Sequence, residues 1–267
     1  MGALAHYLEE AGLATTQISL VRPHTERIRP PRALWVSFEL GRPFGAPGDP
    51  AFQRRVIGMA LGLLERKDGP VLEDFPEDAP ASADTGDGSG WVCPVALGAP
   101  AGADAAPGSM AEAVAAEMHQ LRPWYDIGLK ARNGRTTVGL SRIEITDLAM
   151  FITEFLERPW PENPREDVQL VDTLKYATED LKSFYLEAAA AQPGRQADSA
   201  ALDNWFWDET TASTVLFALR PILMESGDEY AAKIGDRTLI PAAQRERKAA
   251  ALQFSDAAAD ESSRQLP

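Results

Sequence analysis

The chain has 267 residues, 45% of them hydrophobic and 25% charged, and its net charge is −14 at pH 7. This size suffices for one large domain or two small ones, and the acidic balance argues against sequence-independent nucleic-acid binding. Cys93 is the only cysteine, which excludes an internal disulfide, and no apolar run approaches the ~20 residues of a membrane-spanning helix. Because Glu9 and Glu10 stand where a signal peptide would be basic, we expect a cytoplasmic protein that binds neither membranes nor nucleic acid.

The N-terminal quarter predicts a small α/β layer. Apolar residues recur at helical spacing over residues 3–11, whereas residues 15–21 alternate between apolar and polar side chains as a strand does. A second strand is expected over residues 33–38, and a helix over residues 52–65 follows a loop rich in glycine and proline. This order of elements indicates that residues 1–66 form an α/β segment whose two strands share one sheet.

The composition changes after this segment. Residues 67–109 are dominated by acidic residues, Gly, Pro, Ser and Ala, and we interpret them as a loop or linker. Residues 110–241 are predicted to be mainly helical, and residues 242–267, which are Ala-rich and polar without a regular period, are expected to form a flexible tail. The predicted fold class is therefore α/β, with a small N-terminal α/β layer followed by a mainly α-helical region.

Apolar periodicity places several helices in this second region. The clearest spans residues 168–191, where a continuous apolar stripe predicts one buried face. Further helices are expected over residues 110–122, 146–157 and 201–226, the last bent at Pro221. A short strand is expected over residues 136–140 after an Asn-Gly turn signal.

Basic residues gather in the predicted α/β layer. Residues 1–66 carry eight basic and six acidic side chains, whereas residues 67–267 carry 18 and 34. Arg22 and Arg42 follow the two predicted strands, each beside a proline, and the carboxyl ends of parallel strands are where ligands bind in open α/β sheets. We therefore predict that Arg22 and Arg42 bind a small carboxylate, with His24 as a proton donor. The alternative is that both arginines pair with the acidic helical region and stabilise the fold.

The opening segment also carries a resemblance to a known family. It contains Gly2-Ala3, a helix ending in LEEAGL (8–13), a strand at 16–20 and the loop FELGRP (38–43), in that order. This order resembles the C-terminal part of component B of the glycine, sarcosine and betaine reductases (selenoprotein B) and of the related proline reductase. The resemblance covers residues 1–66 and implies a bacterial-type, oxidoreductase-related α/β protein.

The resemblance also implies a difference in chemistry. In that family a selenocysteine or cysteine motif of the form UxxC or CxxC directly precedes the Gly-Ala pair, whereas this sequence has only Met1 there. We therefore expect the redox nucleophile to be absent. The protein is then an accessory subunit or a diverged enzyme that binds a small carboxylate or an amino-acid-like amine, and its cofactors are unknown.

Two further interpretations stay open. One is a non-catalytic binding or scaffold protein that docks a separate redox subunit, and an assembly of identical chains is compatible with either view. The other is a metal-dependent enzyme whose site would combine Glu117, His119, Asp126 and Glu209, although no metal-ligand spacing links them in the sequence. The sequence contains no P-loop, no GxGxxG motif after a strand and no GxSxG motif.

Several other reactive or aromatic residues are expected to be structural. Cys93 lies among apolar neighbours in WVCPV, which favours an inert buried thiol over a nucleophile. Aromatic side chains in the helical region could line a pocket, but core packing is the more common role for such residues. They are Trp124, Tyr125, Tyr185, Trp205, Phe206 and Trp207, and Asp208 and Glu209 follow the last three.

Overall fold

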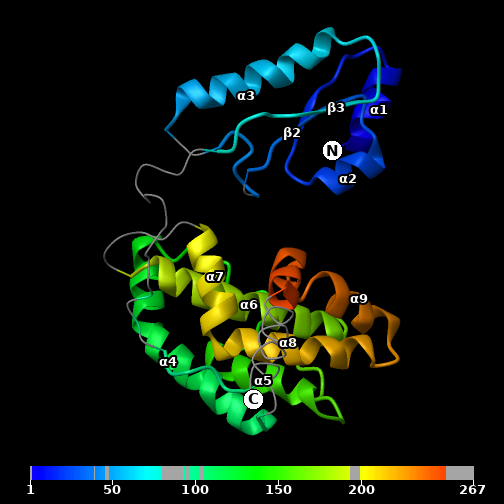
Figure 1. Ribbon diagram of the computed structural model, residues 1–267. Coiled ribbons are helices and arrows are strands. Elements are labelled where there is room, and N and C mark those ends of the chain that lie inside the picture. Colours follow the sequence, from blue (N-terminus) through cyan, green and yellow to red (C-terminus); the bar gives the residue numbers. More distant parts are fainter. Residues whose placement is uncertain are drawn as a thin grey trace, which may run out of the picture. The chain divides into compact units, whose positions relative to one another are not determined.

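The computed structural model describes residues 2–38, 40–45, 48–79, 93, 95, 97–102, 105–192 and 199–250. The chain forms two compact units, Met1–Asp87 (unit 1) and Gly88–Pro267 (unit 2), which are described separately (Figure 1). No helix in the described ranges is long and apolar enough to cross a membrane.

Unit 1 is an α/β layer built on three parallel strands. Its elements are α1 (Gly2–Glu10), β1 (Gln17–Ser19), α2 (Arg22–Ile28), β2 (Arg32–Trp35), α3 (Pro50–Gly62), the 3₁₀ turn η1 (Leu63–Glu65) and β3 (Val71–Asp74). The strand order is β1-β2-β3, with Ile18 opposite Leu34 and Leu34 opposite Glu73. The prediction that the first two strands share one sheet is confirmed.

The core of unit 1 lies between the sheet and α3. Leu34 and Val36 are fully buried against Phe52 and Val56 of α3, because both segments present apolar side chains at the spacing of their own secondary structure. The side chain of Asp49 caps α3 by accepting a hydrogen bond of 2.9 Å from the Phe52 amide.

Two elements of unit 1 differ from the expectation. The segment after the first strand is the helix α2, which begins with Pro23 in its first turn, a position where a missing N–H costs nothing. β3 lies within residues 67–109, which were assigned to a loop or linker. Its four residues carry two carboxylates, and the strand forms because its backbone completes the open side of β2.

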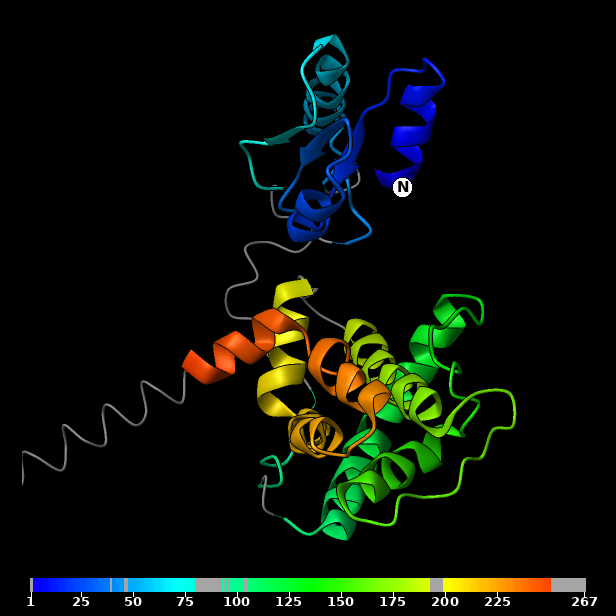
Figure 2. The same ribbon diagram turned by 90° about the vertical axis from the view of Figure 1, so that its right-hand side faces the viewer.

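Unit 2 is helical and is organised around α6. Its elements are α4 (Pro107–Ala131), η2 (Ile145–Asp147), α5 (Leu148–Thr153), η3 (Glu154–Leu156), α6 (Leu170–Ala190), α7 (Ser199–Glu209), α8 (Thr211–Met224) and α9 (Glu229–Arg237). Helix α6 contacts α4, α5, α7, α8 and α9, and its apolar stripe is buried among them (Figure 1, Figure 2). The mainly helical region and the central helix over residues 168–191 are confirmed.

Helix boundaries in unit 2 differ from the sequence-based predictions in three places. α4 continues through Pro123 to Ala131 instead of ending near residue 122. The helix expected over residues 201–226 is two helices, which separate at Thr210 and not at Pro221. Thr210 has an extended backbone, and its hydroxyl accepts from the Ser213 amide at 3.1 Å, so it caps α8. Residues 242–250 are helical, whereas the rest of the expected tail, 251–267, lies outside the described residues.

The strand expected over residues 136–140 is instead a loop fastened to α6 by two carboxylates. Asp180 is fully buried and accepts from the amides of Gly139, Leu140 and Ser141 at 2.8–2.9 Å and from the Ser141 hydroxyl at 2.6 Å. Glu187 lies two helical turns further along α6. The loop amides donate their hydrogen bonds to side chains of α6. Their hydrogen-bonding capacity is therefore satisfied without a neighbouring strand.

Glu187 fastens the start of the same loop. It accepts hydrogen bonds from the amide and hydroxyl of Thr137 and from the Thr136 hydroxyl, each at 2.8 Å, and from Arg132 at 2.6 Å. Partial burial raises the pKa of Glu187, but these hydrogen bonds outweigh it and the net pKa lies below the ordinary value. The carboxylate is therefore held in its charged form at neutral pH.

Candidate functional site

Unit 1 contains a groove that runs along β1. It has a volume of about 680 Å³ and is lined by Gly2 at the start of α1, by the whole stretch 16–21, by the start of α2, by Pro43 and Phe44, and by one side of α3. Among the described residues that line it, none is Asp, Glu, Lys or Arg, and His24 is the one ionisable side chain. In a chain that is one quarter charged, this is a distinctly uncharged surface.

One wall of the groove is the open edge of the sheet. β1 has β2 on one side, and the Val36 amide donates to the Ser19 carbonyl at 2.9 Å across that junction. Since successive backbone groups of a strand point to opposite sides, the N–H and C=O of Ile18 point away from β2. Within the described ranges neither group has a hydrogen-bond partner, so the groove presents an unpaired donor and acceptor.

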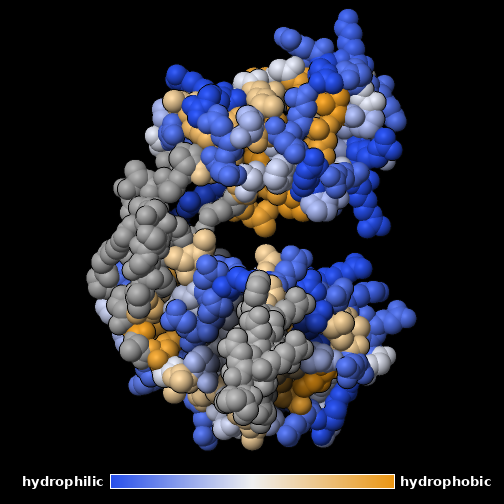
Figure 3. All heavy atoms as spheres, viewed as in Figure 1, coloured by the Kyte–Doolittle hydropathy of each residue, from blue (hydrophilic) through white to orange (hydrophobic). Residues whose placement is uncertain are grey.

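The opposite wall is apolar and exposed. Ile57 and Leu61 of α3 are 39% and 53% exposed, although they lie one turn apart on a helix whose other side forms the core. Val21 and Phe44 extend the same apolar surface and are 47% and 39% exposed. On the face of unit 1 that Figure 3 shows, hydrophobic side chains likewise reach the surface among hydrophilic ones. Solvent exposure of neighbouring large apolar groups is typical of an interaction surface.

Few polar groups reach the groove. The hydroxyls of Ser19 and Thr25 bond to each other, and both lie within hydrogen-bond distance of the Val21 carbonyl, so their capacity is used within the fold. The Thr16 hydroxyl oxygen is buried and, among the described residues, has no partner. The partly exposed Gln17 side chain and the exposed imidazole of His24 are polar groups of the lining that a bound molecule can contact.

The two predicted arginines do not share the groove with His24. Arg22 bonds to Glu26 at 2.5 Å and to Asp74 at 3.0 Å, and its guanidinium lies 5.6 Å from the centre of the Trp35 ring. Its partners thus belong to unit 1, not to the acidic helical region. Arg42 is exposed in the loop beside Pro43 but is not among the lining residues. The geometry brings only His24 of the predicted set to the cavity.

Cys93 is buried in unit 2, as its neighbours in the sequence predict. The residue is 7% exposed, and its thiol donates to the Gln192 side-chain oxygen at 3.4 Å. Burial raises the pKa of this thiol, which keeps it protonated and a poor nucleophile at neutral pH.

The aromatic side chains of unit 2 form core. Tyr185, Trp205, Phe206 and Trp207 are each less than 5% exposed and contact one another edge to face or tilted. Tyr125 joins the same core, and Trp124 packs partly buried against it. Asp208 pairs with Arg247 on the surface at 2.6 Å, and Glu209 is exposed.

The residues considered for a metal site are not brought together. Glu117 is buried, where it accepts from the Tyr185 hydroxyl at 2.8 Å and from the Thr211 amide at 2.7 Å. Asp126 pairs with Arg122 at 2.8 Å, and His119 is exposed. In the part of the chain that the structure describes, no three His, Cys, Asp or Glu side chains lie close enough to hold a metal ion.

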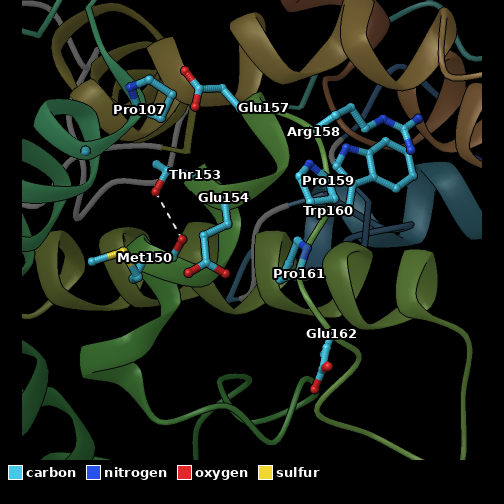
Figure 4. Close-up of a pocket in the computed structure, with 11 residues that line it drawn as sticks. Pro107, Met150, Thr153, Glu154, Glu157, Arg158, Pro159, Trp160, Pro161 and Glu162 are labelled. Carbon is cyan, nitrogen blue, oxygen red and sulfur yellow. Dashed lines mark hydrogen bonds between the residues drawn. The ribbon is translucent and has the colours of Figure 1, made fainter.

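A second cavity, of about 580 Å³, lies in unit 2 between the end of α5 and the start of α4 (Figure 4). Glu154, Glu157 and Glu162 line it together with Trp160, whose ring lies 3.6 Å from the Arg158 guanidinium. Figure 4 shows Glu157 directed toward Pro107 and Glu162 away from the other two carboxylates. The proline-rich sequence RPWPENP (158–164), which was not among the predicted sites, is the sequence signal that could have indicated this cavity. Since Arg158 already occupies the tryptophan face, the cavity lacks a free aromatic surface for a cationic ligand.

The groove along β1 is therefore the best-formed candidate site. It can hold an extended or apolar molecule. Its lining offers one imidazole and backbone groups, whereas an active site would combine a nucleophile, a base and an anion-binding group. Compared with known proteins, the chain matches no family model, no curated protein and no solved structure.

Proposed function

We propose that the protein is a non-catalytic accessory or scaffold protein, and that unit 1 docks an extended apolar segment of a polypeptide in the groove along β1. One observation carries this proposal: an uncharged apolar groove follows an open strand edge whose Ile18 N–H and C=O are unpaired among the described residues. Recognition by strand addition uses these two components, since backbone hydrogen bonds provide affinity and side-chain pockets provide specificity.

The nature of the docked protein follows from the sequence resemblance alone. If residues 1–66 are related to component B of the glycine, sarcosine and betaine reductases, then the docked segment belongs to a redox subunit of such a reductase. The buried position of Cys93 supports a non-catalytic role, because that thiol is neither exposed nor activated.

A peptide titration tests the docking proposal. A fluorescein-labelled peptide TTQISLV, uncharged and alternating, is titrated with the full chain, and its anisotropy is expected to rise on binding. Leu61→Asp places a carboxylate in the apolar wall and is expected to weaken binding about tenfold or more. The control Leu13→Asp changes a residue of similar exposure, 58%, outside the groove and should leave binding unchanged. Equal binding by both variants would contradict the proposal, as would the absence of binding to a monomeric chain at about 1 mM protein.

The same proposal predicts that the isolated chain does not reductively cleave glycine, sarcosine, betaine or proline. A single buried thiol cannot supply the second reducing equivalent that a dithiol or a selenol-thiol pair provides. Product formation is measured with dithiothreitol as electron donor. Turnover by the purified chain that disappears in Cys93→Ser would show that this prediction is wrong.

Binding of a small carboxylate is the second candidate function, supported by His24, which lies in the first turn of α2 and lines the groove. Arg22 pairs with Glu26 and Asp74 of unit 1. Arg42 precedes Pro43, which lines the groove, so its substitution tests this candidate. Calorimetric titration with acetate and glycine compares the parent chain with Arg42→Ala. Loss of binding at an unchanged melting temperature supports the carboxylate site, whereas a lower melting temperature with unchanged binding shows a structural role for this loop.

A further inference from the structure

We infer that the segment which occupies the groove is β1 of a second copy of this chain, in a two-fold symmetric dimer. This inference rests on the proposed docking function, and it assigns the groove to a second copy instead of the redox subunit that the sequence resemblance implies. Two copies of β1 would pair antiparallel, edge to edge, and join the two three-stranded sheets into one continuous sheet.

The uncharged groove offers a partner of opposite charge no group to pair with, and it lets a second copy approach without charge repulsion. Each chain has a net charge of −14, so two copies repel each other wherever acidic surfaces meet. The stretches that line the groove, 16–21 (TQISLV) and 57–61 (IGMAL), contain no Asp, Glu, Lys or Arg. In a dimer related by a two-fold axis the same patch meets itself, which requires a surface without like charges.

The backbone of β1 is complementary to itself. Ile18 presents one N–H donor and one C=O acceptor to the open side, and in an antiparallel pair two identical residues exchange both hydrogen bonds. With a two-fold axis midway between the two copies of Ile18, the N–H and C=O groups of both copies are hydrogen-bonded at once. The same contact removes the exposed strand edge, which otherwise invites aggregation.

Helix α3 supplies the apolar part of the interface. Ile57 and Leu61, followed by Leu64 in η1, recur at helical spacing on the side away from the core and are 37–53% exposed. Gly58 lies beside them, and a Cβ atom there would meet no described atom within 4 Å. Across the two-fold axis the α3 helices of two copies would pack on the same face of the joined sheet and cover these side chains.

The experiment combines sedimentation equilibrium with hydrogen exchange on the full chain. The parent protein is expected to have twice the mass of the 29.0 kDa chain at micromolar concentration, with the Ile18 amide protected from exchange. In Leu61→Asp two carboxylates face each other near the axis, so we expect dissociation to a monomer and faster exchange at Ile18, by about 100-fold or more. Leu13→Asp, the control outside the groove, should remain a dimer.

Three other results would overturn the inference. A monomer with an unprotected Ile18 amide shows an open groove; if the peptide then binds, docking survives and only the second copy is rejected. A monomer whose Ile18 protection is lost in Leu61→Asp shows that another part of the same chain fills the groove. A dimer that persists in Leu61→Asp, with unchanged Ile18 exchange, places the contact between copies elsewhere.

Discussion

Replacing Asp180 by alanine is expected to lower the free energy of unfolding of unit 2 by about 3 kcal/mol. The carboxylate is fully buried, and its loss leaves three backbone amides and the Ser141 hydroxyl without their acceptor. An unsatisfied buried donor costs about 1–3 kcal/mol, and part of this cost is recovered when the loop opens to water. Asp180→Asn should be intermediate, because one of its two acceptor positions becomes an NH₂ donor facing other donors.

Urea unfolding followed by helical circular dichroism measures this effect, since the helical signal comes mostly from unit 2. The matched control is Glu179→Ala on the same helix. Glu179 pairs with Lys182 at the surface, so its loss should change stability by about 0.5 kcal/mol or less. Equal stabilities of the two variants would mean that Asp180 does not hold the loop.

Replacing Glu117 by alanine is expected to cost about 3 kcal/mol, the second large effect. This buried carboxylate accepts from the Tyr185 hydroxyl of α6 and from the Thr211 amide, the first N–H of α8, and so joins three helices. Burial, followed by the charge of Glu117, raises the pKa of Tyr185 well above its usual value, so the phenol remains a donor at neutral pH. Without Glu117, the hydroxyl and the amide stay buried with their strongest acceptor removed.

A double-variant cycle separates this interaction from simple loss of packing. Tyr185→Phe alone should cost about 1–2 kcal/mol, because the buried carboxylate keeps only the Thr211 amide. The double variant should lose less unfolding free energy than the two single variants lose together. The reason is that the second substitution removes a group that the first had already left unpaired. Glu112→Ala on the exposed side of α4 is the control. Additive effects would indicate that Glu117 and Tyr185 act independently.

The sequence by itself determined the fold class and the elements with strong periodicity. The alternation in residues 15–21 and the apolar stripe in residues 168–191 led to β1 and α6, because a period of 2 or 3.6 buries one face whatever the partner is. The apolar neighbours of Cys93 likewise indicated a buried thiol.

Only the tertiary structure decided the features that depend on distant partners. β3 exists because β2 offers an open side, and the loop at residues 139–141 is irregular because its amides meet Asp180, 39–41 residues away. Arg22 was expected at a ligand site, yet the pairing of β3 places Asp74 beside it and neutralises its charge. The groove could not be predicted for the same reason: it is formed by β1, α3 and the loop at Pro43, and no local pattern records which side of α3 faces the sheet and which stays exposed.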